Sequence, residues 1–475
     1  MSNSGGRHHF LRATTRREML RASGAGFGWL ALAGLARGFG LTQDKSANPL
    51  AAKAPHFAPR AKRVIFLFMH GGPSQVDTFD YKPLLERDNG KPLPFDKPRI
   101  QFAQTGNLLR SPWKFAQHGE CGAWVSELFP HVATKVDDLC FIKSLHGTNE
   151  AHGGALLALH TGSATFVRPS MGSWTLYGLG SENENLPGFI TICPTLGHGG
   201  VNNWSSAFLP GIYQGTPIGN AAVPAKDAAI AHLGNPSVPP AVQRAELDLL
   251  REINGEHLAA RGADDALEAR IASYELAFRM QTEAPGVMDL SNESTETKAL
   301  YGIDDPVTEN FGRQCLLARR LSESGVRFVQ CTHSYKWDQH EKLAADHARN
   351  AHEVDRPIAG LLHDLKVRGM LDDTLVIWSG EFGRTPTAQG TDGRDHNPHG
   401  FTVWLAGGGT KPGLSYGATD DYGFYAARDR VHIHDFHATL LALLGLDHER
   451  LTYRYAGRDF RLTDVSGRVV SEVFA

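Results

Sequence analysis

Short, continuous apolar runs alternate along this chain with longer segments of helical periodicity. The apolar runs occupy residues 63–69, 139–143, 187–193, 325–331, 374–378 and 401–406. Such runs, without alternating polar positions, are typical of strands in a parallel sheet whose two faces are both covered. Residues 346–368 have the apolar spacing of a helix and connect two of the runs, which predicts a βαβ unit. The pattern therefore predicts an α/β fold with a parallel sheet between helices.

Two segments interrupt this alternation. Residues 197–220 are rich in Gly and Asn, and we expect a long functional or lid loop there. Residues 241–281 have a strong helical pattern with interleaved charges, but heptads are not sustained, so a coiled coil is not indicated. We interpret about residues 235–290 as a helical insertion that packs on the sheet.

The amino-terminal region has the features of an export signal. Arg16 and Arg17 precede an uncharged stretch rich in Gly, Ala and Leu over residues 22–36. This stretch is shorter than the ~20 residues that a membrane span needs, and paired arginines before it are typical of a twin-arginine signal. We predict a signal peptide over residues 1–41, a linker over 42–60 and one α/β domain over 61–475. The protein would be exported, periplasmic or secreted, with no stable membrane span in the mature chain; the alternative is a short uncleaved anchor.

Composition excludes some classes of function. The formal net charge of the 475 residues is -3, so there is no basic field to attract nucleic acid. The five cysteines are widely separated and show no CxxC spacing, so neither a zinc-thiolate site nor a disulfide framework is indicated. The 23 histidines are more informative, because neutral imidazole is the commonest metal ligand.

Ionisable side chains gather after the expected strands. Residues 379–398 follow one strand and lead into the next, and they carry Glu381, Arg384, Asp395 and His396. The carboxyl edge of a parallel sheet is where ligands bind in such folds. We therefore expect this segment to contribute to a site.

Further candidates follow the other strands. His70 ends the first apolar run before two glycines, where an anion or a metal could be held. Thr148 and His152 lie in a polar turn before a helix, where a nucleophile or a ligand is exposed to the helix dipole. Asp338 and His340 are two residues apart on a loop and could both reach one divalent ion.

These segments resemble those of a twin-arginine-exported, sulfatase-like bacterial family of unknown function within the alkaline phosphatase superfamily. The matching stretches, in chain order, are 70–74 with 77–80, 168–172 with 177–183, 337–340, 379–384, 393–398 and 437–441. The resemblance implies a parallel sheet between helices and hydrolysis of phosphate or sulfate esters with the help of divalent metal ions.

The resemblance also implies roles for individual residues. His70 takes the place of the superfamily's first metal-binding Asp, and His152 takes the place of its nucleophile, counted back from the Thr-Gly pair at 161–162. Glu381 retains the carboxylate of a later Asp-His pair. Asp338 and His340 resemble the remaining metal pair with altered spacing, and His396 resembles the final histidine ligand.

The leading hypothesis is an exported hydrolase of phosphate or sulfate esters that uses a divalent metal, Zn, Ca or Mn. His152, Thr148 or Ser170 would attack, and Arg384 or Arg394 would clamp the anionic group. The metal ligands would come from His70, Asp338, His340, Glu381, Asp395 and His396. The alternative is a non-catalytic protein on a degenerate hydrolase fold that binds a sulfated or phosphorylated glycan. Convergence of His70, His152, Glu381 and His396 within metal-binding reach would distinguish the two.

Overall fold

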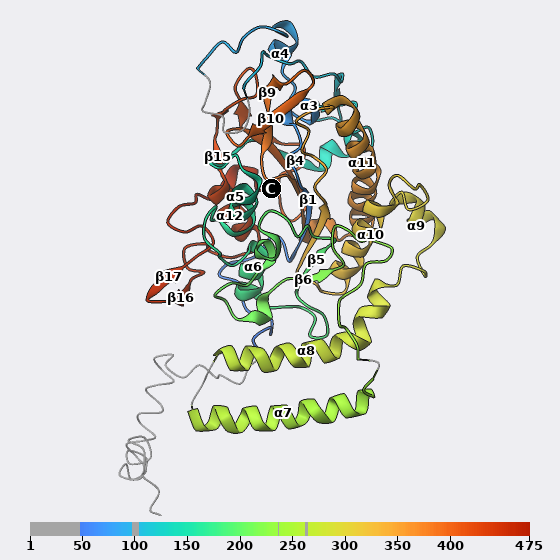
Figure 1. Cartoon of the computed structure of the whole chain (residues 1–475), viewed down its shortest axis with the longest axis vertical. Coiled ribbons are helices and arrows are strands. Elements are labelled where there is room, and N and C mark those ends of the chain that lie inside the picture. The colour runs from blue at the N-terminus through green and yellow to red at the C-terminus, as the bar shows by residue number, and fades with distance from the viewer. Residues whose placement is uncertain (1–47, 97–103, 236, 262–264) are drawn as a thin grey trace, which may run out of the picture. The chain divides into compact units, whose positions relative to one another are not determined.

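The protein is described by a computed structural model that covers residues 48–96, 104–235, 237–261 and 265–475 (Figure 1). Its compact unit spans Pro49–Ala475. The central sheet has the strand order β12-β4-β11-β8-β1-β7-β5-β6, with β15 paired to β4. Its strands are β1 (Arg63–Met69), β4 (Leu139–His146), β5 (Phe189–Ile192), β6 (Thr216–Ile218), β7 (Phe328–His333), β8 (Thr374–Ser379), β11 (Phe401–Ala406), β12 (Ser415–Tyr416) and β15 (Val431–His432).

Strand β1 explains why the apolar runs are continuous. Ile65 and Leu67 on one face belong to one hydrophobic core, whereas Val64 and Phe66 on the other face belong to a second core. Both faces exclude water, so every position of the strand after Arg63 is apolar. One side of the sheet is covered by α10 (Glu309–Glu323) and α11 (Leu343–Val367). The other side is covered by α5 (His152–Thr161), α6 (Met171–Leu179) and α12 (Ile433–Leu443) (Figure 1). The expected parallel sheet between helices is confirmed.

Two long helices occupy the segment that we expected to be a helical insertion. They are α7 (Pro240–Arg261) and α8 (Asp265–Met288), which pack on each other at the lower end of Figure 1. The shorter helices are α3 (Gln75–Thr78), α4 (Pro83–Arg87) and α9 (Thr295–Leu300). Within the described residues, no helix is both long and apolar enough to cross a membrane.

Strand β11 differs from its neighbours in direction. It runs antiparallel to both β8 and β4, whereas β1 is parallel to β7 and β8. Because β11 runs backwards, its amino end lies at the sheet edge where β8 ends. The segment between them, which we expected to be a polar loop, forms an antiparallel hairpin of β9 (Gly383–Gln389) and β10 (Gly393–Asn397).

The remaining strands form small separate ladders: β2 (Phe115–His118) with β3 (Ala123–Ser126), β13 (Ala418–Thr419) with β14 (Ala426–Arg428), and β16 (Tyr453–Tyr455) with β17 (Arg458–Phe460). The expected signal peptide lies outside the described residues. Of the expected linker, Lys53 and His56 donate backbone hydrogen bonds to the carbonyls of Leu179 and Gly445. This part of the segment is therefore held against the compact unit.

Candidate metal centre

The candidate site lies at the carboxyl edge of the parallel strands. His70 follows β1, Asp338 follows β7 and Glu381 follows β8, while His152 begins α5 after β4. The turn after β1 depends on Gly71, whose φ is +117°. A Cβ atom at this position would lie 2.7 Å from the backbone nitrogen of Trp337, so only glycine lets the two loops approach this closely.

The carboxylate of Asp338 is the centre of the cluster. Its Oδ1 lies 3.0 Å from Nε2 of His340 and 3.1 Å from Nε2 of His396, and its Oδ2 lies 3.2 Å from Nε2 of His152. Ligand atoms from these four residues all fall within 4.8 Å of one another. Four residues from three distant segments of the sequence therefore converge on one point.

The opposite nitrogen of each imidazole faces an atom that can only accept a hydrogen bond. Nδ1 of His152 donates to Glu381 Oε1 at 2.7 Å, Nδ1 of His396 donates to the Glu150 carbonyl at 2.7 Å, and Nδ1 of His340 donates to the side-chain oxygen of Gln389. A neutral ring with its proton on Nδ1 presents the lone pair of Nε2. All three Nε2 atoms thus point at Asp338. When protonated they donate to its carboxylate, and when deprotonated they present lone pairs that can bind a metal ion. Histidine ligands of metal ions are oriented in this way by second-sphere acceptors.

The charges of the cluster shift its pKa values. Burial opposes the shift at Asp338, but hydrogen bonds from His152, His340 and His396 hold the pKa of its carboxyl well below the usual range. Burial likewise would raise the pKa of Glu381, yet the hydrogen bond from His152 lowers it to about 2. Burial lowers the pKa of His152, but its bonds to both carboxylates outweigh this and raise it to about 9. The two carboxylates therefore remain ionised at neutral pH.

These residues fit a divalent cation. Burial lowers the pKa of His396, which favours the neutral ring that a metal ion requires. Its Nε2 lies 3.1 Å from Oδ1 of Asp338, with which it shares a proton in the absence of a cation. In a tetrahedral site with ligand bonds of ~2.0–2.1 Å, neighbouring ligand atoms are about 3.3 Å apart, close to the distances around Asp338. The donor set and its spacing both suit a metal ion.

A second group of histidines adjoins the first. His70, His152 and His198 offer nitrogen atoms within 4.8 Å of one another. His70 is fully buried, and both of its ring nitrogens lack a hydrogen-bond partner among the described residues. Burial lowers the pKa of His70 to about 4, so the ring is neutral. The ring of Tyr335 lies 4.8 Å from that of His70 and 5.0 Å from that of His198.

His198 and Tyr335 were missed by the sequence-based prediction. His198 lies in the segment that we expected to be a lid loop, but no spacing marked it as a ligand. Both residues have left-handed backbone conformations, with φ of +46° and +52°. Such strain in non-glycine residues clusters at functional sites.

The two arginines do not act as the expected anion clamps. Arg384 has no exposed surface, and its guanidinium donates to Asp338 Oδ1 at 2.6 Å and to the carbonyls of Gly71, Gly72, Trp337 and Arg394. Arg394 is equally buried and makes two hydrogen bonds to Asp77, at 2.7 and 3.1 Å. Both are turned into the protein, where they fix the loops and, in the case of Arg384, the orientation of Asp338.

Three other expected site residues lie apart from the converging ligand atoms. Ser170 caps α6 and its hydroxyl accepts from the Ser173 backbone, as a helix start requires. Thr148 is exposed and does not line the cavity at the cluster. Asp395 accepts from the backbone of His396 at 2.8 Å, and its other oxygen is buried without a hydrogen-bond partner among the described residues.

The candidate cluster is open to a cavity of about 410 Å³. It is lined by His152, His198, Asp338, His340 and His396. These side chains are thus accessible to a small molecule.

The chain belongs to the DUF1501 family, described as a protein of unknown function, whose family model matches residues 61–474. A search of curated proteins found no match. Similar solved structures include the alkaline phosphatase of the Antarctic bacterium TAB5, with 12% identity, a TM-score of 0.30, and 78% of this chain and 97% of that chain covered.

Two further similar structures are PsFucS1 sulfatase from Pseudoalteromonas sp. and the lipoteichoic acid synthase LtaP from Listeria monocytogenes. The first has 14% identity and a TM-score of 0.34, with 82% of this chain and 69% of that chain covered. The second has 10% identity and a TM-score of 0.34, with 87% and 78% covered. At such scores the likeness is distant, so the chemistry of the site rests on its own residues.

Proposed function

We propose that this protein is a metal-dependent hydrolase of phosphate or sulfate esters. One observation carries the proposal: three imidazoles, each with Nδ1 engaged by an acceptor, direct Nε2 toward the carboxylate of Asp338 at the edge of an open cavity. Asp338, His340, His396 and His152 would hold the ion. Three nitrogens and one carboxylate favour zinc over calcium, which prefers six to eight oxygen ligands.

The bound ion would supply Lewis-acid polarisation of the ester and activation of water. The chain's own residues orient these parts. Glu381 keeps the proton of His152 on Nδ1, and Arg384 holds Asp338 in place through a hydrogen bond of 2.6 Å. Tyr335 and His198 lie beside the cluster, where they can donate hydrogen bonds to the anionic group of the substrate.

This assignment makes His152 a ligand and not the nucleophile, because one nitrogen cannot coordinate an ion and attack an ester at the same time. The test is chemical trapping with a phosphate ester, followed by mass spectrometry of the peptide that contains His152. We expect no phosphorylated histidine. A phosphohistidine at this position would overturn the ligand assignment and support covalent catalysis.

The activity itself is tested with p-nitrophenyl phosphate and p-nitrophenyl sulfate after loading with zinc, manganese or calcium. Turnover is expected in the wild type, a loss of at least about a hundredfold in His396→Ala, and no change in His399→Ala. His399 is a matched control because its ring packs against Tyr425 at 5.5 Å and does not line the cavity. Equal activity in the two variants would contradict the proposal.

The second candidate is non-catalytic binding of a sulfated or phosphorylated glycan. It is favoured by the positions of Thr148 and Ser170, since neither hydroxyl lines the cavity at the cluster. Metal binding with no turnover of any ester, together with saturable binding of a sulfated glycan, would favour this candidate over the hydrolase.

We also propose export by the twin-arginine route, on the basis of Arg16 and Arg17 before the apolar stretch. Replacement of both by lysine should retain the protein in the cytoplasmic fraction of a bacterial host. Unchanged export of that variant would contradict the proposal.

A further inference from the structure

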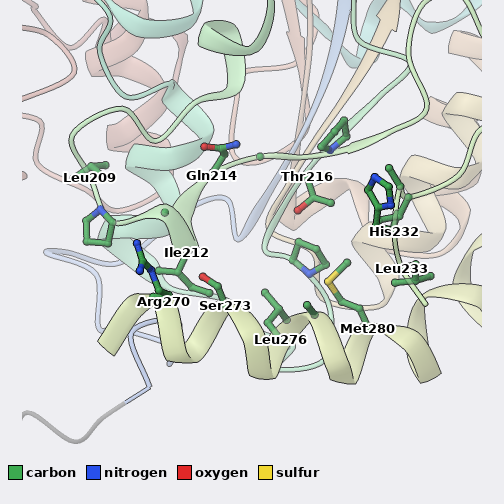
Figure 2. A pocket seen from close by; sticks show the side chains of 18 of the residues that line it. Leu209, Ile212, Gln214, Thr216, His232, Leu233, Arg270, Ser273, Leu276 and Met280 are labelled. Carbon is green, nitrogen blue, oxygen red and sulfur yellow. The ribbon is translucent and has the colours of Figure 1, made fainter. Parts of the chain in front are cut away.

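A second cavity lies apart from the candidate metal centre. It has a volume of about 750 Å³ and lies between α8 and the segments 208–217 and 230–233 (Figure 2). None of the residues that line it also lines the cavity at the metal cluster. Its volume falls in the range of small-molecule sites, which is about 300–1,000 Å³.

One face of α8 forms the long wall of the cavity. Arg270, Ser273, Leu276 and Met280 follow one another at intervals of three or four residues, so they share one side of the helix. Figure 2 shows their side chains directed toward the segment that carries Ile212. Met280 lies ten positions after Arg270 in the sequence, which corresponds to about 15 Å along the helix axis. The cavity is therefore elongated.

The apolar part of the wall is mainly aliphatic. Apart from Phe208 and Tyr453, it consists of three prolines, two alanines and the longer side chains of Leu209, Ile212, Ile230, Leu233, Leu276 and Met280. Such a lining suits a hydrocarbon chain better than a sugar, which binds through stacked aromatic rings and paired polar groups. No Asp or Glu is found among the described residues that line the cavity. The cavity thus lacks a group that would repel an anion.

Arg270 stands at one end of this wall (Figure 2). Arg270 is exposed, and within the described part of the chain its guanidinium has no ion pair and no hydrogen bond. The neighbouring arginines of the insertion differ: Arg244 and Arg251 both pair with Glu275, at 2.8 and 3.1 Å. An unpaired cation at one end of an apolar channel is complementary to an anion that carries an apolar chain.

We propose that this cavity binds a single-chain amphiphile with an anionic head group. The head group would pair with Arg270, and the chain would lie along Leu276 and Met280 toward Leu233 (Figure 2). This site is independent of the metal centre and of ester hydrolysis. It gives the helical insertion a function of its own.

The test uses dodecanoate, at concentrations below those at which it forms micelles, titrated into the full-length protein by calorimetry. We expect saturable binding of one molecule per chain. Dodecanol, which lacks the charge, and butyrate, which lacks the long chain, should each bind at least about tenfold more weakly. An absence of saturable dodecanoate binding would overturn the proposal.

Variants separate this cavity from other apolar surfaces. Arg270→Gln should weaken dodecanoate binding about tenfold. Arg454→Gln, an equal loss of charge at an exposed residue outside the cavity, should leave it unchanged. Ala277→Phe places a ring in the cavity and should abolish binding. Undiminished binding in Ala277→Phe would refute the site.

The metal centre supplies the last control. His396→Ala should bind dodecanoate as tightly as the wild type, because the two cavities share no residue. Loss of binding in this variant would mean that the carboxylate is held by the metal, and the proposal would be wrong. Failure of the hydrolase proposal leaves these expectations unchanged.

Discussion

Substitution of Glu381 tests whether this carboxylate binds the metal ion itself or only orients the ligand His152. Its Oε1 accepts from Nδ1 of His152 at 2.7 Å, and its two oxygens accept from the Gly71 backbone at 3.0 and 3.1 Å. Both oxygens are thus occupied by the chain itself. Glu381→Gln retains the size and one acceptor but removes the charge. Loss of such an outer partner typically lowers metal affinity ten- to a hundredfold, or by about 1.4–2.7 kcal/mol.

The assay is a metal titration in competition with a chelator, with the number of bound ions determined separately. We expect Glu381→Gln to bind the same number of ions with this weaker affinity. Glu353→Gln is the matched control, because Glu353 accepts from His333 at 2.8 Å in a similar pair outside the cluster. A change of less than twofold in Glu381→Gln, or complete loss of the ion in a variant that still folds, would refute the orienting role.

Two further predictions concern stability, measured by urea denaturation. Gly71→Ala combines a φ of +117° with a Cβ contact of 2.7 Å and should cost about 3 kcal/mol or more, whereas Gly90→Ala, with no atom within 4 Å of its added Cβ, should cost about 1 kcal/mol. Equal costs would contradict the close approach of the two loops. Burial lowers the pKa of His437 to about 3, so the unfolded state binds more protons as the pH falls through 6.5. This group therefore lowers the free energy of unfolding by roughly 2.3 kcal/mol between pH 6.5 and 4.5. His437→Gln should therefore lose less stability on acidification than the wild type; an identical pH dependence would be the contrary result.

The sheet was predictable because burial of both faces gives each strand a continuous apolar run in the sequence. Strand β1 has the expected bounds of 63–69, since each side chain after Arg63 lies in one core or the other. The hairpin of β9 and β10 has no such apolar run. It contains Arg384 and Arg394, whose burial depends on acceptors such as Asp77 that lie about 300 residues away in sequence. Burial of a charge is a property of the folded chain, so sequence pattern alone suggested a loop.

The site was predictable only in part for the same reason. Asp338, His340 and His396 stood after strands or in a polar segment, and the topology brings them together. The sequence could not indicate that Glu381 would face His152 or that Arg384 would turn inward. His198 had no signal besides its place in a Gly-rich loop, since a single histidine without a spaced partner does not identify a ligand.

The most direct test of the metal centre is the metal content of the purified protein. Elemental analysis of the wild type should find about one equivalent of a divalent ion, and His396→Ala and Asp338→Asn should retain much less. The His399→Ala control should retain as much as the wild type. A wild type that holds no zinc, manganese or calcium even after loading would contradict the assignment of the cluster as a metal site.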